Sequence, residues 1–194
     1  PKDLDEALDG LLILYSHVPS ITTYPVYIGR LDVLLDPFIT DEQQDYVKIK
    51  RFLNHIDKTI PDSFCHANIG PYDTKAGRLI LQAVIELGNP TPNMTIRYDK
   101  KKTSSAFAEL AAKACLLVSK PSFANDAYYI SDLGEQYGIA SCYNALPECG
   151  GAYTLTRLRL GTIARACQST DEMVNHLLPK VAKLALSTMD KRHK

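Results

Sequence analysis

Short runs of β-prone residues alternate along this chain with longer segments whose apolar residues recur at helical spacing. The extended runs are 24–28, 63–70, 94–98, 127–130 and 138–142, and the helical segments are 4–18, 40–60, 74–87, 104–119, 155–167 and 171–189. Strands that alternate with long helices are typical of an α/β architecture, either layered or closed into a barrel. We therefore expect residues 1–194 to form a single α/β region.

Individual residues mark several helix ends. Pro19 is expected to close the first helix, and Thr40 with Gln43 resembles a capping box at the start of the second. Gly88 follows the third helix, where a left-handed residue commonly ends a helix. Pro179 lies inside the last helical segment and predicts a kink there.

Composition places the chain among ordinary globular proteins and excludes several classes. Its 194 residues are 45% hydrophobic and 23% charged, enough to bury one sizeable core. The 22 basic and 22 acidic residues cancel, so we expect no nucleic-acid partner and no attraction to an anionic membrane. The longest apolar stretch, Leu11–Tyr15, is far shorter than the ~20 residues of a membrane span.

The cysteines indicate a reducing compartment. They stand at 65, 115, 142, 149 and 167, are odd in number and form no CxxC pair, which argues against a disulfide framework. We therefore expect a cytoplasmic protein. The sequence has no HExxH, GxGxxG, GxSxG or P-loop motif and no cysteine cluster suited to zinc or iron–sulfur binding, so no metal site is predicted.

Cys142 is the strongest candidate for chemistry, because the small strand-like run 137–141 delivers its thiol to a loop. A nucleophilic thiolate needs a neighbouring cation or helix terminus, and no histidine lies close to Cys142 in sequence. A thiyl radical instead needs an abstractable hydrogen, a nearby radical donor and an enclosed site. A buried, inert cysteine is the alternative reading.

Several segments, taken in order, resemble the glycyl radical enzymes of the pyruvate formate-lyase family. Asn89-Pro90-Thr91-Pro92-Asn93-Met94-Thr95-Ile96 is the closest local match. The others are Gly29-Arg30 with Leu34 and Leu35, the 67–70 loop, the helix 74–88 and Phe123-Ala124-Asn125-Asp126 before Cys142. Their shared order and spacing identify the chain as similar to a shorter branch of that family.

The resemblance implies a barrel of two parallel half-sheets surrounded by helices, of which this chain would supply a central fragment. Cys142 would become the substrate-attacking thiyl radical. The family's glycine-radical segment, with its Arg-Val-x-Gly-Tyr pattern, is absent from these residues. No cofactor is therefore expected in this chain. The implied partners are a separate radical-activating enzyme, the remainder of the parent chain, a small-molecule substrate and a second copy in a homodimer.

The residues around Cys142 depart from the known reactions of the family. Ser141 stands where pyruvate formate-lyase has a second cysteine, and Asn144 stands where the diol dehydratases have an acid/base glutamate. Glu148 is the candidate replacement for that acid/base. Asn144 can orient a substrate by hydrogen bonds, and Arg157, with Arg159 as its competitor, suits a substrate carboxylate. His66 and Asn68 are candidate pocket-wall groups through the resemblance.

Three functions follow as hypotheses. The first is radical C–C or C–O bond chemistry on a small, oxygen-rich, carboxylate-bearing molecule. The second is acyl transfer similar to that of pyruvate formate-lyase. The third, from a different class, is a catalytically silent α/β domain that binds a ligand or a partner.

Overall fold

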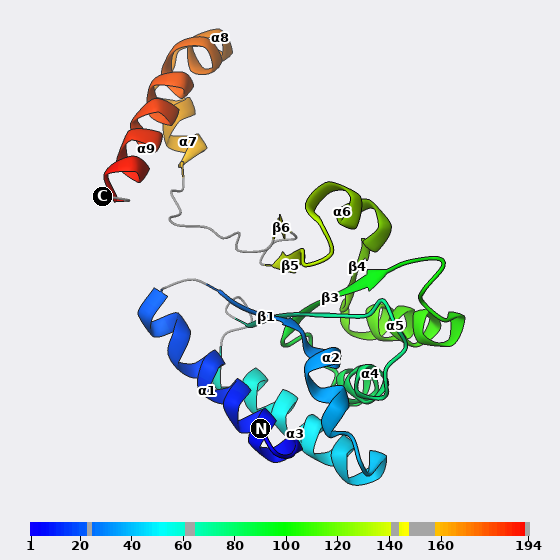
Figure 1. The fold of residues 1–194 in the computed structure, drawn as a ribbon. Coiled ribbons are helices and arrows are strands. Elements are labelled where there is room, and N and C mark those ends of the chain that lie inside the picture. Colours follow the sequence, from blue (N-terminus) through cyan, green and yellow to red (C-terminus); the bar gives the residue numbers. More distant parts are fainter. Residues whose placement is uncertain (23–24, 61–64, 141–143, 148–157, 193–194) are drawn as a thin grey trace. The chain divides into compact units, whose positions relative to one another are not determined.

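The computed structural model describes residues 1–22, 25–60, 65–140, 144–147 and 158–192 (Figure 1). The chain divides into two compact units, Pro1–Glu148 and Cys149–Lys194. The expectation of one α/β region over 1–194 stays a prediction for the longer protein. Each unit is described by itself.

The first unit contains a parallel sheet in which strand order follows chain order, β1-β2-β3-β4. Helices connect successive strands, as parallel pairing requires. The strands are β1 (Val26–Arg30), β2 (Cys65–Ile69), β3 (Asn93–Tyr98) and β4 (Ser122–Asn125). The helices before and between them are α1 (Leu4–Thr22), α2 (Leu31–Leu35), the 3-10 turn η1 (Asp36–Phe38), α3 (Glu42–Thr59), α4 (Lys75–Leu87) and α5 (Ser105–Val118).

Alternation along the strands gives the sheet two different faces. One face is apolar and packs against the helices to form the main core, in which Cys65, Ala67, Ile69, Met94 and Ile96 are all buried. The register places Ala67 beside Met94 and Ile69 beside Ile96, so the apolar side chains of β2 and β3 line up on this face. The helices α1 to α5 cover this face of the sheet (Figure 1). The opposite face carries polar side chains, among them Asn68, Thr95 and Arg97.

Local capping explains most helix boundaries. Thr74 accepts a hydrogen bond from Gly77 N at the start of α4, and Gly88 ends that helix at φ 68°, as expected. The cap of α3 is Asp41, whose side chain accepts from the amides of 43 and 44, so the prediction of Thr40 was wrong by one residue. The prediction that Pro19 closes α1 was also wrong: the helix continues to Thr22, because one missing amide removes only one hydrogen bond.

The segment after β4 corrects another prediction. Residues 127–130, predicted as extended, lie within helix α6 (Asp126–Leu133), which the Asn125 side chain caps by accepting from Tyr128 N. The strand lies just before it, as β4. The run at 138 does form a strand: β5 (Gly138–Ala140) pairs antiparallel with β6 (Asn144–Leu146).

The second unit is helical in its described part. It contains α7 (Leu160–Arg165), α8 (Thr170–Glu172), the π-helical turn η3 (Met173–Leu177) and α9 (Leu178–Arg192). Pro179 lacks the amide that would bond the carbonyl of residue 175, and the wide turn η3 accommodates this irregularity just before it. The kink predicted at Pro179 itself stays a prediction.

The chain thus has a mixed α/β fold with a four-stranded parallel sheet and surrounding helices, as predicted. Closure of this sheet into a barrel stays a prediction. Within the described part of the chain, no helix combines the length and the apolar character needed to cross a membrane.

Candidate functional site

The polar face of the sheet is buried rather than solvated. Alternation puts Tyr27, His66, Asn68, Thr95 and Arg97 on the face opposite the helices, and the last four are at most 4% exposed. Polar groups this deeply buried are costly unless they form hydrogen bonds. Two of them, Asn68 and Arg97, bond to the segment 135–140, which leads to Cys142.

Asn68 binds the backbone of β5 at two points. Its Nδ2 donates to Ile139 O at 2.8 Å, and Ile139 N donates to its Oδ1 at 2.9 Å. Tyr27 Oη donates to the same Oδ1 at 2.9 Å. The asparagine therefore uses both lone pairs of its oxygen and one N–H of its nitrogen, and it bonds β5 to the sheet much as a neighbouring strand would.

The ring of Tyr27 also restricts the position of β5 sterically. A Cβ atom built at Gly138 would overlap the ring of Tyr27, so only glycine lets the strand approach this closely. Burial raises the pKa of Tyr27, while Arg97 and Arg30 act in the opposite direction. The Tyr27 hydroxyl thus remains protonated and serves as a donor to Asn68.

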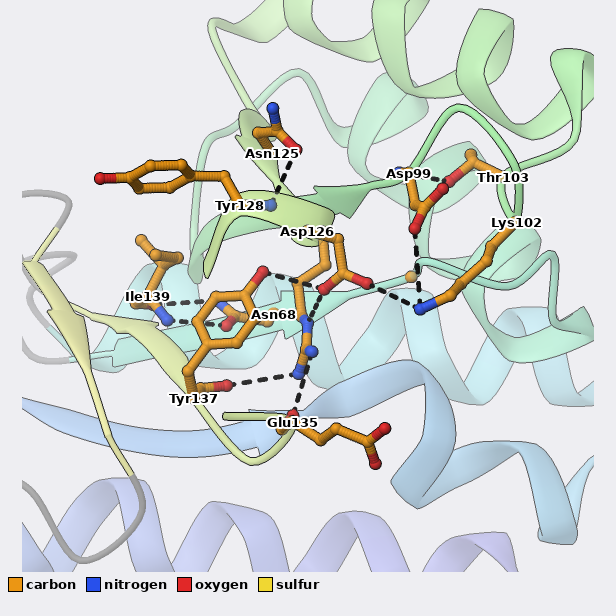
Figure 2. Close-up of polar contacts among 12 residues, drawn as sticks. Asn68, Asp99, Lys102, Thr103, Asn125, Asp126, Tyr128, Glu135, Tyr137 and Ile139 are labelled. Carbon is orange, nitrogen blue, oxygen red and sulfur yellow. Dashed lines mark hydrogen bonds and ion pairs between the residues drawn. The ribbon is translucent and has the colours of Figure 1, made fainter. Parts of the chain in front are cut away.

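Arg97 anchors the chain just before β5 (Figure 2). Its Nε donates to Asp126 Oδ1 at 2.7 Å, its Nη2 to Glu135 O at 3.1 Å and its Nη1 to Tyr137 O at 3.3 Å. The guanidinium carbon lies 4.1 Å from the centroid of the Tyr137 ring. One arginine therefore joins β3, the first turn of α6 and the segment leading to β5.

Asp126 is the centre of this network. Besides Arg97, Tyr137 Oη donates to its Oδ1 at 2.9 Å, and Lys102 Nζ lies 3.5 Å from its Oδ2 and 3.6 Å from Asp99 Oδ2 (Figure 2). Burial raises the pKa of Tyr137, and the bond to Asp126 acts in the same direction while Arg97 opposes it. The Asp126 carboxylate is fully buried and is balanced by two cations.

The pairing of β5 with β6 locates Cys142 along the chain. Ala140 pairs with Asn144, so residues 141–143 join β5 to β6. The predicted Cys142 is the middle residue of this connection but lies outside the described residues, as do Glu148 and Arg157. Asn144 is exposed at the start of β6. Its predicted role and those of Cys142, Glu148 and Arg157 stay predictions.

His66 and Asn68 are brought together on the polar face of β2, two residues apart. The His66 carbonyl accepts a hydrogen bond from Tyr15 Oη at 2.9 Å, which ties α1 to the strand. The pocket-wall role predicted for His66 and Asn68 stays a prediction, although Asn68 does bond strand β5 of the hairpin. Their predicted contact with substrate remains a prediction, and for Asn68 the structure shows a backbone partner.

A half-open hollow lies beside β5. Ile139 contributes to its wall together with Thr95, and the remaining lining comes from β4 and from the two tyrosines of α6 at 128 and 129. Among the described residues, no group of three or more His, Cys, Asp or Glu side chains is arranged to hold a metal ion. The contacts that the described residues make around β5 are hydrogen bonds that hold the chain leading to residue 142.

Comparison with known proteins identifies the family. The family model described as "Glycyl radical enzyme YjjI-like" matches residues 1–194. The chain belongs to the YjjI-like glycyl radical enzyme family. This confirms the resemblance read from the ordered sequence segments.

Two curated members resemble this chain closely. An uncharacterized protein of Haemophilus influenzae (strain ATCC 51907 / DSM 11121 / KW20 / Rd) is 89% identical over 194 residues, which cover 100% of this chain and 38% of that protein. The uncharacterized protein YjjI of Escherichia coli (strain K12) is 44% identical over 194 residues, covering 98% of this chain and 38% of that protein. The YjjI-like chain thus spans 38% of the length of these relatives, as expected for a fragment.

Sequence reasoning missed the residues that hold the segment 135–140 before Cys142, namely Arg97, Asp126, Tyr137, Tyr27 and Gly138. A signal for Arg97 was present, because Thr95 and Arg97 alternate with Met94 and Ile96 in β3. That alternation is ordinarily read as a solvated face of a strand. Nothing in the local sequence tells that a distant segment will cover the face and take up its hydrogen bonds.

Proposed function

We propose that the longer protein containing this chain is a glycyl radical enzyme in which Cys142 is the reacting thiol. The chemistry would be cleavage or rearrangement of a C–C or C–O bond in a small, oxygen-rich, carboxylate-bearing molecule. A separate activating enzyme would install the glycyl radical elsewhere in the parent chain. Cys142 would donate its hydrogen atom to that radical and then attack or abstract hydrogen from the substrate.

The observation that carries this proposal is the fixed approach to residue 142. The strand β5 is bonded to the polar face of a parallel sheet by Asn68, and the chain before it is bonded by Arg97. A radical thiol needs such a fixed position, because hydrogen-atom transfer depends steeply on the distance between the reacting atoms. Family membership over the whole chain supports the same reaction class.

The test uses the full-length protein, activated without oxygen by its activating enzyme. A panel of small hydroxy- and oxo-carboxylates is supplied, and their consumption is followed by NMR. We expect one or more compounds to be consumed by the wild-type protein, none by Cys142→Ala, and the same compounds by Cys115→Ala. Unchanged consumption by Cys142→Ala would show that this assignment is wrong.

A further inference from the structure

Asn68 has a different task from contact with substrate. We propose that Asn68, supported by Tyr27, is a positioning residue for Cys142: it holds on the sheet the strand β5 that leads to this residue. This inference rests on the proposed role of Cys142 as the reacting thiol. It assigns the asparagine to the protein backbone of β5, whereas the family resemblance alone assigned it to the pocket wall.

The two hydrogen bonds between Asn68 and Ile139 carry the argument. They run in opposite directions and join one side-chain amide to both the N–H and the C=O of one residue, at 2.9 and 2.8 Å. A single bond would let β5 pivot, whereas this pair fixes both its height along β2 and its rotation. Asn68 is 0% exposed, so water does not compete for either bond.

Tyr27 adds a second constraint, on register. Its ring fills the place that a side chain at 138 would need, and its hydroxyl orients the Asn68 amide at 2.9 Å. A shift of β5 by one residue would bring a side chain at 137 or 139 onto this ring and would reverse which side chains face the sheet. Gly138 therefore permits one register, in which Ile139 meets Asn68.

The consequence reaches Cys142 through the covalent chain. Cys142 stands three positions after Ile139, and three residue steps span at most about 10 Å. A change in the position of Ile139 is therefore transmitted to the thiol over a short, limited path. Misplacement of a reacting group by about 1 Å costs on the order of 100-fold in rate.

The experiment reads the position of Cys142 in two ways without any substrate, in the full-length protein. The first is the rate of alkylation of Cys142 by iodoacetamide before activation, followed by peptide mass spectrometry. The second follows the EPR doublet of the activated protein in D₂O. There the Cys142 S–D transfers deuterium to the glycine Cα radical, giving a thiyl radical and a CHD glycine. Return of the hydrogen atom leaves a Cα–D radical and collapses the doublet.

The variants are Asn68→Leu, which keeps the volume but removes both bonds, and Tyr27→Phe, which keeps the ring but removes one bond. Asn54→Ala, at an exposed position of α3, is the control. We expect Asn68→Leu to slow collapse of the doublet by about 100-fold at equal radical yield and to change the Cys142 alkylation rate by at least about 10-fold. Tyr27→Phe should give smaller changes in both rates, and the control should give none.

Wild-type rates in both assays for Asn68→Leu would overturn the proposal, since a residue that only contacts substrate leaves substrate-free rates unchanged. If Asn68→Leu fails to fold, wild-type rates for Tyr27→Phe would overturn it instead. Failure of the proposed function looks different: the doublet of the wild-type protein would not collapse in D₂O. The alkylation rates would then still decide whether Asn68 positions the loop.

Discussion

The buried Arg97–Asp126 pair gives the sharpest stability prediction. Replacing Arg97 by Met keeps much of the side-chain volume but leaves a fully buried carboxylate and two backbone carbonyls without their main donor. Tyr137 Oη and Lys102, at 2.9 and 3.5 Å, remain as partners of Asp126. The variant therefore loses an ion pair in a place where water cannot replace it.

The magnitude follows from the burial of both partners, whose side chains are 5% and 0% exposed. Breaking such a pair by removing one partner costs about 3–5 kcal/mol. Because Lys102 offsets part of the buried charge, we expect the lower end, about 3 kcal/mol, which corresponds to roughly a 150-fold change in an opening equilibrium. The paired change Arg97→Met with Asp126→Asn should cost much less than the two single changes added together, because it leaves no buried charge without its partner.

The assay is hydrogen exchange followed by mass spectrometry on the full-length protein, read for the peptides that cover 93–98 and 135–140. Arg78→Met is the matched control, since Arg78 and Asp73 also form an Arg–Asp ion pair, here with two hydrogen bonds, but its arginine is 52% exposed. Exposed pairs contribute little, so the control should exchange like the wild type. If the losses of the two single variants simply add in the double variant, the reasoning about the Arg97–Asp126 pair is refuted.

Two further predictions concern Gly138 in β5 and the buried carboxyl group of Asp32 in α2. Gly138→Ala should raise the rate of hydrogen exchange at 137–140 by about 10-fold or more, because the added Cβ would overlap the Tyr27 ring. The control Gly10→Ala, at a glycine with open space around it, should leave exchange unchanged. Wild-type exchange in Gly138→Ala would contradict the close approach of β5 to Tyr27. Burial raises the pKa of Asp32 to about 6 despite the hydrogen bond from Gly70 N at 2.8 Å. Because the folded state holds the Asp32 proton more tightly than the unfolded state does, protonation of Asp32 stabilises the fold. This contribution to the free energy of unfolding is fully present below about pH 4 and is lost as pH rises through 6. Asp32→Asn keeps an oxygen that can accept the bond from Gly70 N but removes the titrating group. The Tm of the full-length protein should therefore change less between pH 5 and 7.5 in this variant, and the same change as in the wild type would contradict the assignment to Asp32.

Much of the fold could be predicted because its signals are local. The apolar spacing and caps of α4, with Thr74 at its start and Gly88 at its end, determine that helix without tertiary help. The prediction of an extended segment at 127–130 was wrong because it considered only the β-prone side chains. The side chain of Asn125 caps a helix there instead. The short β6 was missed for a related reason, since its strand character depends on pairing with β5.

The candidate site, too, could be predicted from the sequence only in part. Cys142 could be singled out, and the family could be recognised, from segments that keep their order along the chain. The residues that hold its approach could not, because Asn68 and Ile139 are 71 positions apart and Arg97 and Tyr137 are 40 apart. Their pairing depends on the sheet forming first and presenting its polar face. Long-range hydrogen bonds of this kind have no periodic signature.

The most direct test of the account is the fate of the glycyl radical doublet in D₂O in the activated full-length protein. A thiol at position 142 that exchanges hydrogen with the radical should collapse the doublet in the wild type and in Cys115→Ala. In Cys142→Ala the radical should form to the same yield and the doublet should persist. A doublet that collapses at the wild-type rate in Cys142→Ala would contradict the central claim that the loop carried by β5 supplies the reacting thiol.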